Sequence, residues 1–353
     1  MIVVNSAPGA CEDTYASIRH ALWNGWTFAD TIFPAFLWIV GVALTLSTAS
    51  RLERGASRAS LLRHAATRTA MLVGLGWIMN LFYFPERHFP FFGFMDHLQV
   101  TGVLQKIAVC YFLAFLIVLW SGWRGAIVGI VVLNLSFLAF LFFYPVPGCG
   151  AGSLSPECNF AGYLDQSVFG AYRWIDGNPH GHDPDGFGSI LPATSTVLFG
   201  VLAGALLRAK REPKEICRSI LGLGAVLLVC GTALSEWVIP INKPLWTPSY
   251  AFLMAGLSSA VFAVCYWAAD IRRLSFRGFE PFEIYGRNAI AAYAISIEAA
   301  NIPKVHVHGT SLYDLCLNIV GVPNAALLYA LVYTAAVFVP IWWMHRRQWY
   351  LKF

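Results

Sequence analysis

A histidine and a carboxylate bracket a short polar segment that leads directly into an apolar stretch. His20 begins the segment, Asp30 ends it, and residues 31–46 are largely apolar. An ionisable side chain at membrane depth is costly, so one placed there is a candidate functional group. Histidine accepts protons near neutral pH, and a carboxylate can fix its tautomer. The pair is therefore a candidate for base catalysis at the mouth of a membrane span, with a merely solvated interfacial histidine as the alternative.

The composition places this pair in a membrane protein. Of 353 residues, 58% are hydrophobic and only 12% are charged, whereas about a quarter of a soluble chain is charged. Apolar runs near the ~20 residues that a helix needs to cross a bilayer recur throughout. They are too long and too uniformly apolar for barrel strands. We expect an all-α, polytopic membrane helix bundle forming a single domain over residues 1–353. We expect no nucleic-acid partner, because the basic residues lie in short loops.

About ten transmembrane helices are expected. The first apolar residues look like the tail of a first span whose beginning is missing, ending near Asn5. The other nine are predicted at Phe28–Ala49, His64–Phe84, Leu98–Trp120, Trp123–Tyr144, Ile190–Leu207, Cys217–Val238, Pro248–Ala269, Phe282–Ile302 and Pro323–Met344.

The loops between these spans alternate in charge. Arginine and lysine gather after every second span and in the C-terminal tail, as in Arg51–Arg68 and Arg208–Arg218. The positive-inside rule places these segments in the cytoplasm. His20 then faces outside, as does the longest loop, 145–189. That loop contains Cys149 and Cys158, for which we expect a disulfide in an oxidising compartment, with two free thiols as the alternative.

Other polar residues within predicted spans indicate a cavity inside the bundle. Lys106 lies about two turns into one span, and Arg287 and Asn288 lie early in another. Each alone is more simply explained by pairing that locks the bundle, but so many together favour a polar cavity.

Two outer loops are also rich in polar groups. One is Asn242–Tyr250, and the other is His180–Gly186, which contains two histidines and two aspartates. Such a set could bind a metal. A turn-rich polar loop explains it better, so we expect no metal. His306 and His308 make a weaker case, because no third ligand lies near them in sequence.

Taken together, these segments resemble the transmembrane heparan-α-glucosaminide N-acetyltransferases and their bacterial relatives. The resemblance covers nearly the whole chain in family order, and it is strong in sum although each piece is weak. It implies a membrane enzyme that transfers an acetyl group from cytoplasmic acetyl-CoA to an amino sugar on the other side. The matching stretches are Val3–Asn5, His20–Thr27 with Asp30, Ile32–Leu37, Gly102–Ile107, Asp183–Gly186, Lys243–Tyr250 and Gly286–Ala289.

The resemblance assigns roles to particular residues. The family's essential histidine falls on His20, and two further active-site positions fall on Asp30 and Asn5. Asn5 could donate a hydrogen bond to the thioester carbonyl as negative charge develops. His20 either acts as a base in a ternary complex, which we favour, or carries the acetyl group covalently.

Two further sets of residues are expected to bind the substrates. Cationic and polar residues inside the bundle are candidates for acetyl-CoA, since arginine suits phosphate. External polar and aromatic residues are expected to rim the acceptor site. The donor candidates are Arg287, Lys106 and Asn288, and the acceptor candidates are Asp183, Asp185, Lys243, Trp246, Trp23 and Asn24.

Two departures from the family pattern refine these expectations. Lys106 stands where an arginine is common, and the two are not equivalent at a phosphate. The large lumenal extension of the animal enzymes is absent, which favours a bacterial inner-membrane member with a cytoplasmic C-terminus. O-acetylation of a cell-envelope polysaccharide is the alternative reaction, and a solute transporter is the less favoured class. The sequence leaves open whether the protein forms a homodimer.

Overall fold

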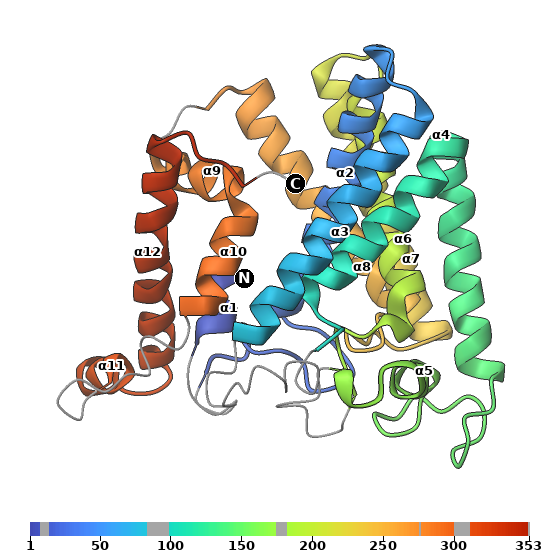
Figure 1. Ribbon diagram of the computed structural model, residues 1–353, viewed down its shortest axis with the longest axis horizontal. Helices are drawn as coiled ribbons and strands as arrows, with labels where there is room; N and C mark the ends of the chain where they lie inside the picture. The colour runs from blue at the N-terminus through green and yellow to red at the C-terminus, as the bar shows by residue number, and fades with distance from the viewer. Residues whose placement is uncertain (8–13, 83–98, 174–181, 275–276, 300–310, 352–353) are drawn as a thin grey trace.

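The computed structural model describes residues 1–7, 14–82, 99–173, 182–274, 277–299 and 311–351 (Figure 1). Within these residues the protein is helical, with isolated bridges and no β-strand, so the all-α expectation is confirmed. The α-helices are α1 (Ile2–Ser6), α2 (Ile32–Glu53), α3 (Arg58–Phe82), α4 (Val103–Phe143), α5 (Phe160–Phe169), α6 (Ile190–Leu207), α7 (Pro213–Trp237), α8 (Pro248–Tyr266), α9 (Glu280–Arg287), α10 (Ala289–Glu298), α11 (Leu312–Val320) and α12 (Asn324–Arg346).

The structure confirms a polytopic membrane protein, although with fewer long apolar helices than expected. Val103–Phe143 holds two predicted spans, because the chain folds back at Gly122 (φ 59°, ψ −152°), where the two arms of α4 meet (Figure 1). α3 has 25 residues, but arginines in its first turns make it more polar than the others. Six helical segments of the described residues are long and apolar enough to cross a membrane: Phe28–Glu53, Val103–Phe143, Phe187–Leu207, Pro213–Trp237, Pro248–Ile271 and Asn324–Arg346.

The predicted span Phe282–Ile302 is wrong as a single helix. The backbone of Asn288 (φ −125°, ψ 36°) separates α9 from α10. Its side chain donates to the carbonyl of Trp349 at 2.9 Å and accepts from the amide of Leu351 at 3.1 Å. The C-terminal tail therefore anchors the side chain of Asn288 at this break. Two short helices, α5 and α11, lie in segments expected to be loops.

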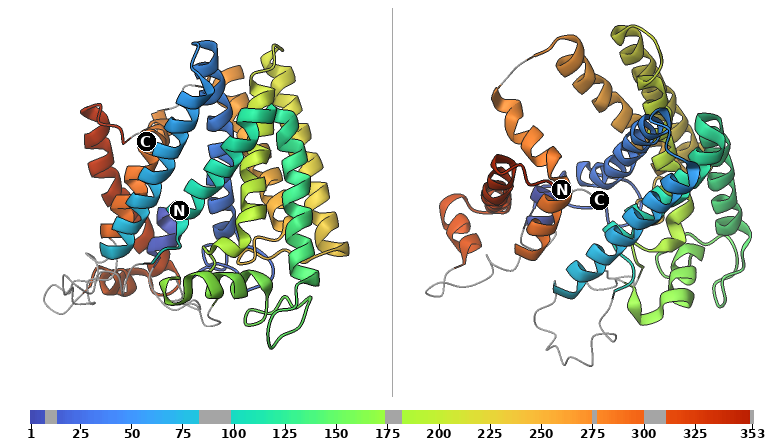
Figure 2. Two further views of the ribbon diagram at one scale, coloured as in Figure 1. Left: turned by 45° about the vertical axis from the view of Figure 1, so that its right-hand side comes forward. Right: turned by 45° about the horizontal axis from the view of Figure 1, so that its top comes forward.

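The two largest hydrophobic cores hold most of the helices together. The larger joins α2, α3, α4, α6, α7 and α8, and the smaller joins α9 to α12 and reaches α1 through Ile2. The views in Figures 1 and 2 show α9 to α12 gathered at one side of the larger bundle. α2 and α6 cross so closely that a Cβ on Gly200 would overlap the backbone oxygen of Trp38. Small residues at helix crossings are typical of membrane bundles, and this one fixes the helix that follows Asp30.

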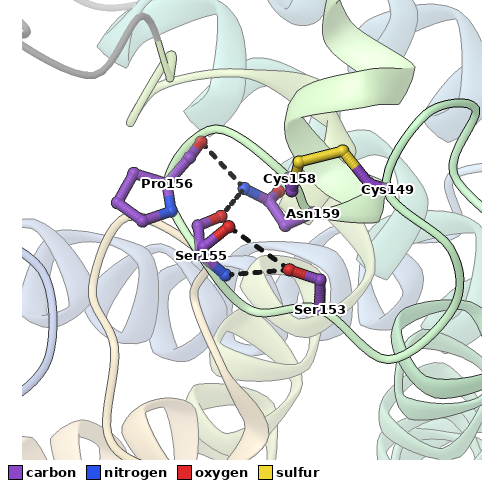
Figure 3. The surroundings of a disulfide bond; sticks show 6 residues. All are labelled: Cys149, Ser153, Ser155, Pro156, Cys158 and Asn159. Atoms are coloured by element: carbon purple, nitrogen blue, oxygen red, sulfur yellow. Dashed lines mark hydrogen bonds between the residues drawn. A yellow bond between two sulfur atoms is a disulfide. The ribbon is translucent and has the colours of Figure 1, made fainter.

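The long loop 145–189 contains the expected disulfide. Cys149 and Cys158 are bonded, with their Cα atoms 5.6 Å apart (Figure 3). Asn159 follows and caps α5, since its Oδ1 accepts from the amide of Gly162 at 2.7 Å. The same loop accepts a hydrogen bond from the indole of Trp23 at the carbonyl of Leu154, at 2.9 Å. The disulfide loop therefore supports the segment that contains His20.

Candidate active site

The segment before α2 folds around the carboxylate of Asp30. Thr27 and Asp30 form a capping box at the start of a 3-10 turn, Phe28–Thr31. Oδ2 of Asp30 accepts from the amides of Thr27 (2.9 Å) and Ala21 (3.0 Å). Tyr250 of α8 donates its hydroxyl to the backbone carbonyl of Asp30 at 2.6 Å. The carboxylate is therefore fully buried and held from several sides.

His20 meets this carboxylate. Its Nδ1 lies 2.7 Å from Oδ1 of Asp30, and its side chain is 46% exposed. When Nδ1–H donates to the carboxylate, Nε2 is the ring nitrogen that can accept a proton. The turn that returns Ala21 and Thr27 to Asp30 creates this contact between residues ten positions apart.

A loop between α7 and α8 brings a cation to the pair. The amide of Gly25 donates to the carbonyl of Ile241 at 2.8 Å, and Nδ2 of Asn242 donates to Oδ1 of Asn24 at 3.1 Å. This pairing places Nζ of Lys243 2.9 Å from Nδ1 of His20 and 3.1 Å from Oδ1 of Asp30. The cluster therefore brings together an imidazole, a carboxylate and an ammonium group.

A cavity of about 440 Å³ opens beside the cluster. α1, α2, α3, α4, α10 and α12 all contribute to its wall, together with residues of the connecting loops. Its volume and its few convergent polar groups are typical of a small-molecule site. Among the residues singled out in the sequence, it brings together His20, Asn5, Asp185 and Lys243.

A narrower cavity of about 80 Å³ adjoins the first, with which it shares Met1, Phe33, Val103 and Tyr293. Arg68 of α3 lies on its wall, with Cζ 4.9 Å from the ring centre of Tyr111. The sequence placed Arg68 only among the cytoplasmic loop charges. Its position inside a predicted span was the available signal that it faces the bundle interior.

Comparison with known proteins identifies the family of this chain. Residues 11–239 match the model of a protein family described as heparan-alpha-glucosaminide N-acetyltransferase, catalytic. The chain belongs to this family. The resemblance seen in the sequence is therefore confirmed.

Two curated relatives extend the comparison. Heparan-alpha-glucosaminide N-acetyltransferase of Mus musculus is 30% identical over 83% of this chain and 50% of its own length. The protein of the same name from Homo sapiens is 29% identical with the same coverage. The chain thus spans about half the length of these relatives.

Asp183 is buried behind the cavity wall of this family member, and Asp185 is partly buried on the wall. Oδ2 of Asp183 accepts from the hydroxyl of Thr101 at 2.5 Å, and its Oδ1 accepts from the amide of Asp185 at 2.9 Å. Asp185 lines the cavity itself. This short hydrogen-bonded turn fixes the carboxylate of Asp185 within electrostatic range of His20 and Lys243.

Lys106 hydrogen-bonds to this turn, and Trp246 packs against Lys106. Nζ of Lys106 donates to the carbonyl of Pro184 (3.2 Å) and to Oγ of Ser189 (2.8 Å). The ammonium lies 4.8 Å from the ring centre of Trp246, whose indole donates to Thr196. Both side chains are fully buried and line neither of the two cavities. Their donor and acceptor roles stay predictions.

The remaining predicted site residues lie outside the two cavities. Arg287 is half exposed and pairs with Glu283 one turn earlier, while Asn288 is bound to the C-terminal tail. Trp23 places its ring against that of His182, with the centres 5.2 Å apart, and Asn24 pairs with Asn242. The substrate-binding roles of these residues stay predictions.

Three observations complete the comparison with the sequence. Thr27 and Tyr250 were missed, although the spacing Thr27-x-x-Asp30 is a capping-box signal. His180, His306 and His308 lie outside the described residues. Within the described ranges, no group of three metal-ligating side chains occurs.

Burial of Asp183 makes the stability of the folded protein depend on pH. It raises the pKa of Asp183 to about 7, with the Asp185 charge acting in the same direction. The folded state thus binds this proton more tightly than the unfolded state. The protonated carboxyl of Asp183 therefore stabilises the folded state by about 1.4 kcal/mol for each unit by which its pKa is raised. This contribution is fully present below about pH 4 and is lost as the pH rises to 7. Asp183→Asn, which mimics the neutral acid, should flatten this fall.

Melting temperatures of the detergent-purified protein from pH 4 to pH 8 check this expectation. Burial lowers the pKa of His182 to about 4, which acts in the opposite direction below pH 6.5. The informative quantity is therefore the difference between wild type and Asp183→Asn at each pH. A difference that does not change between pH 5 and pH 7.5 would contradict the raised pKa.

Proposed function

We propose that this protein transfers an acetyl group from acetyl-CoA to an amino sugar at the larger cavity. The observation that carries the proposal is the contact of His20 with the buried carboxylate of Asp30 on that cavity's wall. Attack of an amine on a thioester requires a base, and an imidazole oriented by a carboxylate supplies one. Asn5 lies on the same wall and can donate to the thioester oxygen as charge develops.

The donor is proposed to arrive from the cytoplasmic side through the narrower cavity. That cavity leads from the Phe33–Tyr293 boundary to Arg68, whose guanidinium suits a phosphate group. The thioester would then reach His20 while the anionic part of the donor stays near the arginines that join α2 to α3. Arg287, Lys106 and Asn288 remain candidate donor contacts.

The acceptor is proposed to enter from the outer side. The carboxylate of Asp185 on the cavity wall suits the ammonium and hydroxyl groups of an amino sugar. Lys243, supported through its loop by Asn24 and Trp246, borders the same opening. The glucosaminide class of the acceptor follows from the names of the relatives.

We propose the orientation in the membrane from the residues found at the two ends of the bundle. The arginine-rich α2–α3 and α6–α7 connections lie at one end, and the disulfide-bearing loop lies at the other (Figures 1 and 2). Arginines favour the cytoplasm, and disulfides persist in oxidising compartments. We infer a bacterial inner-membrane protein with its C-terminus inside.

Cysteine labelling in intact cells tests this orientation. A membrane-impermeant maleimide should label Ser167→Cys on the exposed face of α5 and leave Ser57→Cys, in the α2–α3 connection, unlabelled. Both sites should react after lysis, which controls for accessibility. The opposite pattern in intact cells would overturn the orientation and the outward position of His20.

The reaction is tested directly with purified protein, radiolabelled acetyl-CoA and glucosamine. We expect label in N-acetylglucosamine. An alkali-labile acetyl ester would instead indicate O-acetylation of the sugar. Uptake of the sugar into proteoliposomes without modification would indicate a carrier.

A further inference from the structure

Lys243 is shared between the two members of the proposed catalytic pair. Its Nζ lies 2.9 Å from Nδ1 of His20 and 3.1 Å from Oδ1 of Asp30, and its side chain is 15% exposed. The loop that carries it is tightly built. Oδ1 of Asn242 accepts from the amide of Leu245 at 2.8 Å, and the amide of Asn242 donates to Thr247 at 3.0 Å. Lys243 is therefore held at the pair by its own loop.

The positive charge of Lys243 affects which protonation state of His20 is favoured. A buried carboxylate beside an imidazole stabilises the imidazolium, which cannot accept a proton. An ammonium on the same carboxylate oxygen compensates the charge of Asp30. It also opposes a second positive charge on His20, only 2.9 Å away. The neutral imidazole is thereby favoured, and its Nδ1–H and the ammonium of Lys243 both donate to Oδ1 of Asp30, so that the ammonium does not donate to Nδ1.

We propose that Lys243 is a positioning residue that keeps His20 in its neutral, proton-accepting form by compensating the charge of Asp30. This role rests on the proposed function and deepens it. It differs from the acceptor contact that the sequence indicated for Lys243.

A second carboxylate near the imidazole increases the need for a compensating cation. Asp185 interacts electrostatically with both His20 and Lys243, and its charge, like that of Asp30, favours the imidazolium. Tyr250 is engaged with the Asp30 carbonyl. The other polar or titratable groups on the cavity wall are the Met1 amine and Asn5 and Ser6 from the α1 segment, Asn80 of α3, Gln99 and Thr101 before α4, Tyr293 and Ser296 of α10, and Tyr333 of α12.

The pH dependence of kcat/KM for acetyl transfer tests the proposal. In Lys243→Met the acidic limb of the profile should move to higher pH by about 1–3 units, the size of shift that a charge within 4–6 Å produces. The variant should therefore be strongly impaired at pH 7 and recover toward wild type near pH 9. Lys243→Arg should restore the wild-type limb, and Lys210→Met, at an exposed loop lysine, should leave it unchanged. A loss of equal size at every pH would overturn the proposal.

Chemical modification gives a second measurement that needs no activity. Diethyl pyrocarbonate reacts with the neutral imidazole, and mass spectrometry of the peptide containing His20 reports the rate. Modification at pH 7 should be slower in Lys243→Met than in wild type and equal near pH 9. Equal rates at both pH values would refute the role of Lys243. A wild-type protein that transfers no acetyl group but shows this difference would refute the proposed function alone.

Discussion

His20→Ala should abolish acetyl transfer while the protein still inserts, folds and binds acetyl-CoA. The imidazole contacts Asp30 and Lys243 on the wall of the larger cavity, and half of its surface is exposed there. Loss of a general base typically costs about 10²–10⁴ in rate, and loss of a covalent carrier would cost at least as much. The substitution deletes no packing from either hydrophobic core, so stability should change little.

Turnover with saturating acetyl-CoA and glucosamine measures this effect. His345→Ala is the matched control, because His345 lies at the end of α12 and lines neither cavity. The melting temperature and the affinity for acetyl-CoA separate lost chemistry from lost folding. Near-wild-type turnover in His20→Ala would end the proposed mechanism.

The sequence predicted the chemistry of the pair but not its full geometry. His20 and Asp30 stood out because an apolar run follows them, and the spacing from Thr27 to Asp30 already carried a capping signal. Lys243 could not be placed beside them from the sequence. It lies 223 residues from His20, and its position depends on tertiary pairing of Asn24 with Asn242.

The break between α9 and α10 at Asn288 shows the limit of hydropathy. An apolar run reports composition, so residues 282–302 were expected to form one span. The break at Asn288 is stabilised by the carbonyl of Trp349 and the amide of Leu351, which come from a tail about 60 residues later. Lys106 was rightly expected inside the bundle, but the Pro184 carbonyl and Ser189 that bind it lie about 80 residues away.

Asp30→Asn should reduce acetyl transfer strongly, though by less than His20→Ala if Asp30 only orients the ring. Oδ2 accepts from the amides of Ala21 and Thr27, so the asparagine oxygen is held on that side. The new NH₂ group then faces Nδ1 of His20, which must accept and thereby place its proton on Nε2. A ring with Nε2–H cannot act as the base, and a loss of at least about tenfold is expected within the range for a general base.

Steady-state rates in Asp30→Asn measure this loss, with Asp270→Asn, at an exposed position of the π-helical turn Trp267–Ile271, as the matched control. A second comparison uses Lys243, because its proposed task is to compensate the charge of Asp30. Asp30→Asn combined with Lys243→Met should then cost clearly less than the product of the two single losses, since groups in one network couple. Strictly multiplicative losses would show that Asp30 and Lys243 act on His20 independently.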